Sequence, residues 1–89
     1  MKFDAYIGEF LGTAALVLSI LVLGNPMYIT LAFGLIIYSL GKVSGGHINP
    51  AVSIAMFVKG KQSLENTAGY IVSQVVGGVL AVYMYKMYA

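Results

Sequence analysis

The segment Val43-Ser44-Gly45-Gly46-His47-Ile48-Asn49-Pro50 is polar and rich in glycine, yet an apolar run from Ala51 to Val58 follows it at once. Asparagine is among the best helix N-caps and proline is favoured at the first helical position, so a helix is predicted to begin at Pro50. Eight or nine helical residues cover about 13 Å, less than half of a hydrocarbon core roughly 30 Å thick. A helix this short cannot cross a membrane, so the segment either lies at the interface or dips in and returns.

The composition of the 89-residue chain places most of it in lipid. Sixty per cent of the residues are hydrophobic and only 9% are charged, whereas soluble domains carry about 25% charged residues. Three apolar stretches are expected to be spanning helices, at about 5–23, 27–42 and 64–86. The second is short and reaches the interface through the snorkelling side chain of Lys42. The predicted fold is all-α and transmembrane: one unit over residues 1–89, with three spanning helices plus a re-entrant loop and half-helix at 43–58.

Small residues recur every four positions along two predicted spans, at Gly8 and Gly12 on the first and at Gly69, Ser73, Gly77 and Ala81 on the last. Such rows let helices approach closely in lipid. Most tyrosines lie near the ends of apolar runs and are expected to form an aromatic belt: Tyr6, Tyr28, Tyr70, Tyr83, Tyr85 and Tyr88. Asp4 and Glu9 interrupt the first apolar stretch and no cleavage site follows, so this span is expected to be retained rather than removed as a signal peptide.

Several classes of function are disfavoured by what the chain contains. It has no cysteine, one histidine and three acidic residues, too few groups for a metal centre, a redox site or an acid–base pair. No nucleophile is paired with a base, so an enzyme is not expected and no cofactor is implied. The net charge of +2 is too small and too scattered for nucleic-acid binding.

The re-entrant segment has the parts of a solute pathway. Its glycines allow the backbone of Gly45, Gly46, His47 and Ile48 to run extended, with its carbonyl groups turned aside from helical hydrogen bonds. Non-helical backbone at membrane depth is tolerated only when it is buried in protein or lines a wet cavity. The Asn49 side chain can cap the half-helix with its oxygen and offer its NH₂ group to a passing solute. The positive end of the helix dipole would oppose cations at the same place.

Ser44-Gly45-Gly46-His47-Ile48-Asn49-Pro50-Ala51-Val52-Ser53 closely resembles the first Asn-Pro-Ala loop of aquaporins and aquaglyceroporins, the major intrinsic protein family. Three further motifs resemble this family in the expected order: Glu9-Phe10-Leu11-Gly12-Thr13, Leu31-Ala32-Phe33-Gly34 and Ser73-Gln74-Val75-Val76-Gly77-Gly78. The resemblance covers essentially the whole chain and corresponds to the N-terminal half of a complete member. A second Asn-Pro pair, at Asn25-Pro26-Met27, lacks the alanine and is interpreted as a plain loop between spans.

The resemblance implies a role for each matching residue. Asn49, in the motif it forms with Pro50 and Ala51, would orient water at mid-channel, and the carbonyl groups of Gly45, Gly46, His47 and Ile48 would line the pore. Glu9 would be buried, its carboxylate accepting backbone hydrogen bonds from the loop, with an interfacial charge as the alternative. Gln74 would form hydrogen bonds between helices, and His47 would brace the loop rather than bind a metal.

The selectivity filter departs from the family. An arginine normally follows the second Asn-Pro-Ala, whereas Val52 follows the motif here and the chain contains no arginine. The constriction should therefore be less cationic and wider, which would allow protons or small solutes to leak through. Motif matching places the aromatic filter residue at Phe33, and the short second span leaves Ile29 as the alternative.

A complete family member has two repeats of opposite topology, whereas this chain has one, so a second half-repeat is needed to enclose a pore. The favoured hypothesis is an antiparallel homodimer, with eight chains forming four pores; the alternative partner is another half. One observation opposes it: Lys2, Lys42, Lys59 and Lys61 share one side and Lys86 alone lies on the other, which favours a single orientation with the N-terminus and the re-entrant loop cytoplasmic. The favoured function is a passive water channel; the alternatives are a channel for glycerol or other small neutral solutes, and a non-conducting half-channel or accessory subunit.

Overall fold

A computed structural model describes residues 3–88 of the chain, and all regular structure among them is helical. There are four helices: α1 (Phe3–Leu23), α2 (Pro26–Leu40), α3 (Pro50–Val58) and α4 (Leu64–Tyr88). The all-α class and the order of long helix, short helix, half-helix and long helix expected from the sequence are confirmed.

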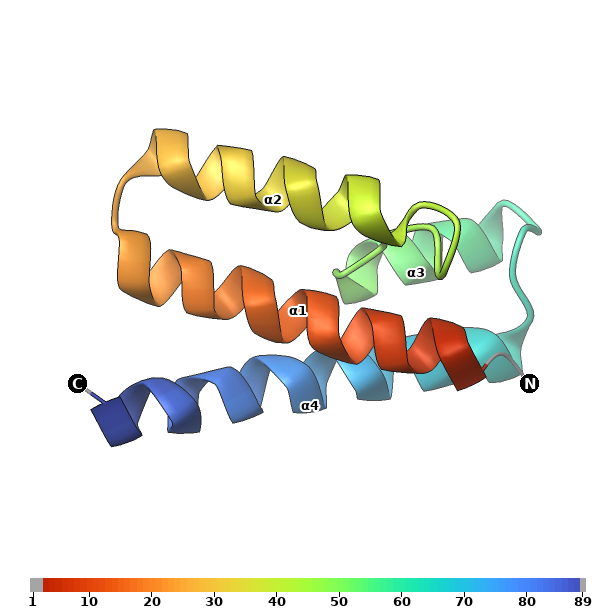
Figure 1. Ribbon diagram of the computed structural model, residues 1–89. Helices are drawn as coiled ribbons and strands as arrows, with labels where there is room; N and C mark the ends of the chain where they lie inside the picture. Colours follow the sequence, from red (N-terminus) through yellow and green to blue (C-terminus); the bar gives the residue numbers. More distant parts are fainter. Residues whose placement is uncertain (1–2, 89) are drawn as a thin grey trace.

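The path of the chain explains how α3 can be so short (Figure 1). Helices α1 and α4 run in the same direction, and α2, which follows α1 in the chain, runs in the opposite direction. After α2, a loop carries the chain inward, and α3 begins near the middle of the molecule and returns to the end at which α2 stopped. Helices α1 and α4 have 21 and 25 residues and are long and apolar enough to cross a membrane. The half-helix therefore enters and leaves at one end of the bundle, which is the geometry of a re-entrant segment.

Helix α2 ends earlier than the sequence analysis expected, at Leu40 rather than Lys42. The carbonyl of Leu40 accepts hydrogen bonds from three successive amides, those of Val43, Ser44 and Gly45, at 2.9, 2.9 and 3.1 Å. This turn satisfies the helix end and changes the chain direction within four residues. It leaves Lys42 exposed beyond the helix and directs the loop toward α1.

Glycines set the closest helix contacts. A Cβ atom on Gly77 would lie 2.4 Å from the carbonyl oxygen of Phe10, and one on Gly69 would lie 2.5 Å from the ring of Tyr6. On the other face of α1, a Cβ on Gly12 would meet the side chain of Leu40 at 2.4 Å. The predicted rows of small residues are thus confirmed as packing surfaces, one for α4 against α1 and one for α2 against α1.

The aromatic-belt prediction is wrong for Tyr70. This side chain is only 3% exposed and forms an edge-to-face contact with Tyr6, the ring centroids being 5.9 Å apart. A tyrosine can be buried because its hydroxyl finds a partner; here it donates to the carbonyl of Ser44 at 2.7 Å. Tyr28, Tyr83 and Tyr88, in contrast, are exposed near helix ends, as expected for a belt.

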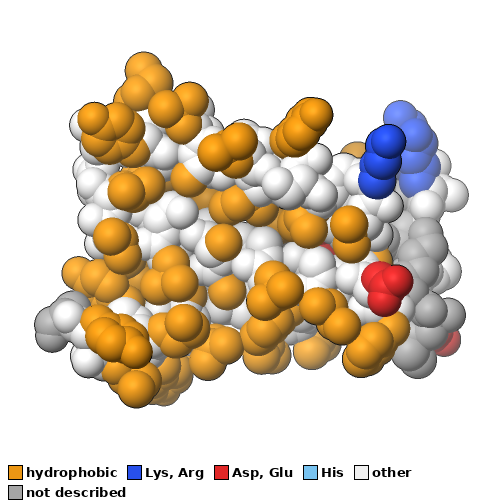
Figure 2. Space-filling model, in the orientation of Figure 1, with side chains coloured by type: hydrophobic (Ala, Val, Ile, Leu, Met, Phe, Trp, Pro, Cys, Tyr) orange, Lys and Arg blue, Asp and Glu red, His pale blue; other side chains and the backbone are white. Residues whose placement is uncertain are grey.

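The surface is that of a protein surrounded by lipid. Figure 2 shows apolar side chains over most of the length of one face, with the charged side chains visible there gathered at one end. Helix α2 has no buried residue, and among the helices α3 packs only on α4. Both short helices therefore keep large apolar faces uncovered by this chain.

Candidate functional site

The site is built around the start of α3, where Asn49 caps the helix. Its backbone is extended, at φ −155° and ψ 124°, and its side-chain oxygen accepts a hydrogen bond from the amide of Ala51 at 2.7 Å. Pro50 follows at the first helical position, where its missing N–H costs nothing. The Asn49 side chain is exposed, and its NH₂ group has no hydrogen-bond partner among residues 3–88. Asn49 therefore combines a bound acceptor with free donors.

Glu9 holds the loop from the side of α1. It is fully buried, and its carboxylate accepts four hydrogen bonds. One oxygen accepts from the Ser44 hydroxyl at 2.6 Å and the His47 amide at 3.1 Å. The other accepts from the Ile48 amide and the Gln74 side chain, both at 2.7 Å. All four partners are neutral donors, so hydrogen bonding rather than an ion pair compensates the burial of this group.

A second layer of hydrogen bonds connects α3 to α4. Gln74, 2% exposed, donates from its side-chain nitrogen to Glu9 and also to the hydroxyl of Ser53 on α3 at 3.0 Å. The Ser53 oxygen lies 2.9 Å from Nδ1 of His47. A hydroxyl has one proton and two acceptor lone pairs, so Ser53 can accept from Gln74 and still form a hydrogen bond with Nδ1 in either neutral tautomer of His47, donating to Nδ1 in one and accepting from it in the other. Among the described residues no group of acidic, histidine and cysteine side chains is placed to hold a metal ion.

Three residues of this network were missed by sequence reasoning. Ser44 joins the loop to Glu9 and also accepts from the amide of Gly46 at 3.2 Å. The Tyr70 hydroxyl donates to the Ser44 carbonyl, and its ring lies at a tilt to the His47 ring, with 4.7 Å between the centroids. Ser53 connects His47 of the loop to Gln74 of α4. A signal was present for Tyr70, which lies four residues before Gln74 and therefore on the same face of α4.

The loop backbone differs from the extended path expected. Gly45, Gly46 and Ile48 all have positive φ, at 88°, 65° and 41°. Such values are ordinary for glycine but costly for a β-branched residue. Ile48 is held there because its amide is bound to Glu9 and its side chain is 4% exposed. No hydrogen bond from a described residue ends on the carbonyls of residues 45–48, which directly precede Asn49 in the chain.

The expected filter residues are not assembled within one chain. Phe33 lies on α2 and is 40% exposed, while Val52 lies on α3 and is 36% exposed. Helices α2 and α3 do not pack on each other, so a single copy does not bring these two side chains together. Ile29, the alternative to Phe33, is half-buried on α2.

Asn25 repeats the capping geometry of Asn49 away from the site. Its side-chain oxygen accepts from the amides of Met27 and Tyr28, at 2.9 and 3.3 Å, and Pro26 opens α2. It lies in the turn between α1 and α2, at the end of the molecule opposite the re-entrant loop (Figure 1). The interpretation of this pair as an ordinary helix start between spans agrees with that position.

Comparison with known proteins gives a consistent set of relatives. The protein-family profile described as Major intrinsic protein matches residues 1–89. Glycerol uptake facilitator protein-like 6 of Lactiplantibacillus plantarum is 40% identical over 85 residues, covering 85% of this chain and 39% of that protein. Aquaporin Z of Photorhabdus laumondii is 47% identical over 57 residues (60% and 25%), and Aquaporin NIP1-1 of Arabidopsis thaliana is 42% identical over 89 residues (84% and 30%). The chain thus spans less than half the length of each relative, and no solved structure gives a significant match.

Proposed function

Since the chain belongs to the major intrinsic protein family, whose members are membrane channels and not enzymes, we propose that it is one half of a passive water pore. The observation that carries this proposal is the arrangement at the start of α3. In the described part of the chain, neither the NH₂ group of Asn49 nor the carbonyl groups of the four residues that directly precede it, 45–48, have a hydrogen-bond partner. A water molecule moving along this edge would pass a line of acceptors and then a donor, which favours single-file transfer of a neutral solute.

The same arrangement opposes ions. The positive end of the α3 dipole points toward the middle of the membrane, where about half a unit of charge would repel cations. The site offers no carboxylate to a passing cation, because Glu9 is fully buried behind the loop and its oxygens are occupied by four donors. Water or another small uncharged molecule is therefore the proposed cargo.

The proposal includes a second half-repeat, which one copy of this chain does not supply. The half-helix packs on α4 alone, and Gly45 and Asn49 are exposed, whereas non-helical backbone at membrane depth needs protein or a wet cavity around it. We favour an antiparallel pair of identical chains, with the two half-helices meeting end to end. Family members act as oligomers in the lipid bilayer, so four such pores, eight chains in all, form the proposed assembly.

The orientation of the chain in the membrane provides a test of the homodimer. Lys42, Lys59 and Lys61 follow the ends of α2 and α3 at one end of the bundle, while Lys86 is near the other; Lys2 lies outside the described residues. The positive-inside rule then favours a cytoplasmic N-terminus and loop, but an inverted pair needs both orientations. Reporters fused to each terminus should reveal both. A single orientation would rule out the antiparallel homodimer and leave another half-repeat as the partner.

Selectivity follows from the residues that the filter lacks. A homodimer has Val52 at both positions after the Asn-Pro-Ala motif and no arginine anywhere in the chain, so its constriction is apolar, with Phe33 as the proposed aromatic wall. This permits glycerol or another small neutral solute as the second candidate, in keeping with the name of the relative from Lactiplantibacillus plantarum. It also removes one barrier to proton leakage, so proton flux belongs among the measurements.

Osmotic swelling of liposomes that contain only the purified chain tests the function. Asn49→Asp keeps a capping oxygen but removes the NH₂ donor and adds a negative charge, so water permeability should collapse. Asn25→Asp is a matched control, because it makes the same change in the same Asn-Pro unit outside the proposed path, and its permeability should stay near the parent value. Swelling no faster than that of empty vesicles would refute the self-sufficient pore and favour a non-conducting subunit.

A further inference from the structure

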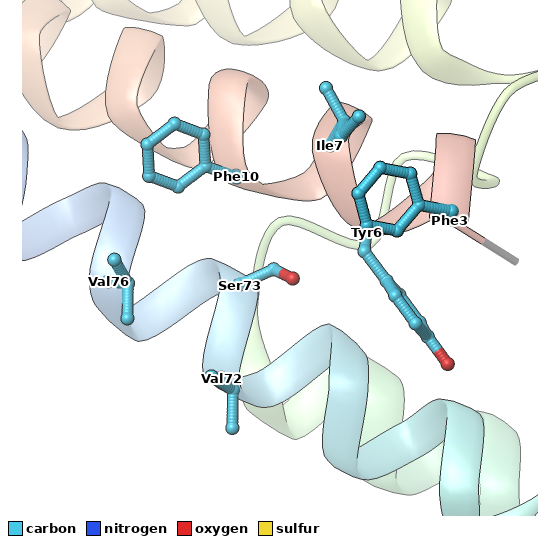
Figure 3. Close-up of a pocket in the computed structure, with 7 residues that line it drawn as sticks. All are labelled: Phe3, Tyr6, Ile7, Phe10, Val72, Ser73 and Val76. Atoms are coloured by element: carbon cyan, nitrogen blue, oxygen red, sulfur yellow. The ribbon is translucent and has the colours of Figure 1, made fainter. Parts of the chain in front are cut away.

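Tyr6, near the start of α1, makes a contact with α4 that lies outside the hydrogen-bond network around Glu9. Its hydroxyl donates to the side-chain oxygen of Asn66 at 2.6 Å, across 60 positions in the sequence. Figure 3 shows the ring reaching from α1 toward the start of α4, with the hydroxyl at its far end. The ring is half-buried and lines a hollow of about 280 Å³ between the two helices. Tyr6 therefore lies at the edge of the packed interior.

The partner of this hydroxyl is held firmly. Asn66 lies in the first turn of α4, which begins at Leu64. Its amide donates to the hydroxyl of Ser63 at 3.1 Å, the bond by which a serine caps a helix. The carbonyl of Ser63 accepts from the amide and the hydroxyl of Thr67, at 2.9 and 2.8 Å. The capped turn leaves Asn66 little freedom, so the Tyr6 hydroxyl is bound to a rigid support.

The ring of Tyr6 lies on the next turn of α4. Asn66, Gly69 and Tyr70 are spaced i, i+3 and i+4 and so share one face of the helix. A Cβ on Gly69 would lie 2.5 Å from the Tyr6 ring, so this ring lies directly against the backbone. The rings of Tyr6 and Tyr70 meet at 88° with 5.9 Å between their centroids, an edge-to-face geometry that aromatic pairs favour. Three positions on α4 thus fix one side chain of α1.

Tyr70 connects this contact to the re-entrant loop. Its hydroxyl donates to the Ser44 carbonyl at 2.7 Å, and its ring lies 4.7 Å from the His47 ring. Both loop residues are also donors to Glu9. Since Ser44 and His47 belong to the segment that is being held, Tyr6 is the partner that supports Tyr70 from outside the loop. A displaced Tyr70 ring would disturb the same segment that Glu9 holds.

We propose that Tyr6 is a positioning residue for the re-entrant loop. Held by Asn66, its ring keeps Tyr70 in the orientation in which the Tyr70 hydroxyl reaches the Ser44 carbonyl. The hydroxyl of Tyr6 is bound to Asn66 and not to the loop, so Tyr6 acts through Tyr70. Neither Tyr6 nor Asn66 belongs to the four motifs that resemble the channel family. The effect on the loop stands by itself, whereas an effect on water movement rests on the proposed function.

Hydrogen exchange of the loop amides in liposomes tests this role. Tyr6→Phe keeps the ring and removes the donor, while Asn66→Leu removes the acceptor. The loss of one hydrogen bond shifts an equilibrium about two- to tenfold, so the amides of residues 46–48 should exchange faster by up to this factor in both variants. The amides of residues 16–21, in the other half of α1, provide the reference and should keep the parent rate.

Two variants serve as controls. Asn66→Asp keeps an acceptor oxygen in the first turn of α4, where a negative charge is favourable, and should retain the parent exchange rates. Tyr38→Phe makes the same change as Tyr6→Phe on a side chain that is 87% exposed near the end of α2, and should also have no effect. Acceleration confined to the loop in Tyr6→Phe and Asn66→Leu supports the proposal. Unchanged loop exchange in both, equal acceleration in Asn66→Asp, or the same acceleration at residues 16–21 would overturn it.

A double-mutant cycle tests whether Tyr6 acts through Tyr70. Tyr70→Phe removes the donor to the Ser44 carbonyl and should itself accelerate exchange of the loop amides. When Tyr6→Phe is added to that variant, the further acceleration should be clearly smaller than in the parent background, because the effects of coupled residues do not add. Full additivity of the two effects would show that Tyr6 does not act through this hydroxyl and would overturn the inference.

Water permeability separates this inference from the proposed function. If the parent conducts, permeability should fall in Tyr6→Phe and Asn66→Leu and stay near the parent value in Asn66→Asp; parent permeability in all three would overturn the effect on water movement. If the parent does not conduct, the proposed pore fails, while hydrogen exchange still decides the role of Tyr6. If the parent conducts and loop exchange is unchanged in the variants, the pore stands and the inference is wrong.

Discussion

Replacing Glu9 by glutamine keeps the size of the side chain and removes one of its two acceptor oxygens. The carboxylate accepts four hydrogen bonds, two at each oxygen. In the variant an NH₂ group must face one pair of donors. If it faces Ile48 and Gln74, both lose their acceptor. If it faces Ser44 and His47, the serine hydroxyl can turn to accept, and only the His47 amide is left unpaired.

The expected cost follows from this count. Hydrogen bonds to a charged group contribute about 1.5–3 kcal/mol each, so the loss of one or two amounts to roughly 2–6 kcal/mol. Folded domains are stable by only about 5–15 kcal/mol, so this is a large fraction of the total. The two backbone amides concerned fix the positive φ of Ile48 and the carbonyls beside it, so conduction should fall as well.

Thermal unfolding in detergent and liposome swelling measure the two effects. A loss of 2 kcal/mol corresponds to a fall in Tm of at least about 8 °C for a chain of this size, and water permeability should drop at equal protein content. Ser39→Ala is the control, since its hydroxyl is exposed and donates only to the carbonyl of Leu35. A Glu9→Gln protein with the Tm and the permeability of the parent would show that the conformation of the loop does not depend on this carboxylate.

Three further substitutions probe the same loop. Tyr70→Phe removes the donor to the carbonyl of Ser44 and should cost about 1–3 kcal/mol by thermal unfolding; an unchanged Tm would contradict the clamp. Gly46→Ala should lose both stability and permeability, because φ is 65° and a Cβ would lie 3.2 Å from the backbone carbonyl oxygen of Ile37. Gly60→Ala, with φ 86° but open space around it, is the control and should lose only some stability. Similar permeability in the two variants would contradict this prediction. Ser53→Ala leaves two side chains without their shared partner, so hydrogen exchange of the loop amides should accelerate, and unchanged protection would refute a bracing role.

The sequence was sufficient for the class of fold because length and hydropathy have few solutions in lipid. Residues 51–58 are too short to span and too apolar for water, and the Asn-Pro pair before them fixes the helix start, so the half-helix was predictable to the residue. The rows of small residues likewise located the contact of α1 with α4. These features depend on local geometry and on the membrane, which a sequence reveals directly.

The interior of the site was only partly predictable, because its partners are far apart in the chain. Glu9 and Gln74 were expected to hold the loop, but nothing local indicated that Ser44 would bind Glu9 across 35 positions or that Tyr70 would leave the interface. The left-handed backbone at Ile48 was also missed, since a β-branched residue argues against positive φ. That conformation exists because a carboxylate from another helix imposes it.

One copy of the chain completes the hydrogen bonds of the re-entrant loop but leaves apolar helix surfaces uncovered. Every donor to Glu9 belongs to the same copy, and so does the residue that clamps the Ser44 carbonyl, so the loop can reach its conformation before any partner arrives. The uncovered surfaces are of another kind: the apolar faces of the short helices α2 and α3. Apolar surfaces gain little from association in lipid except close packing, so fit rather than hydrophobicity would be the basis of the proposed pairing. In the proposed pairing, each half would thus bring to the pore a loop and an Asn49 cap that it has already set in place.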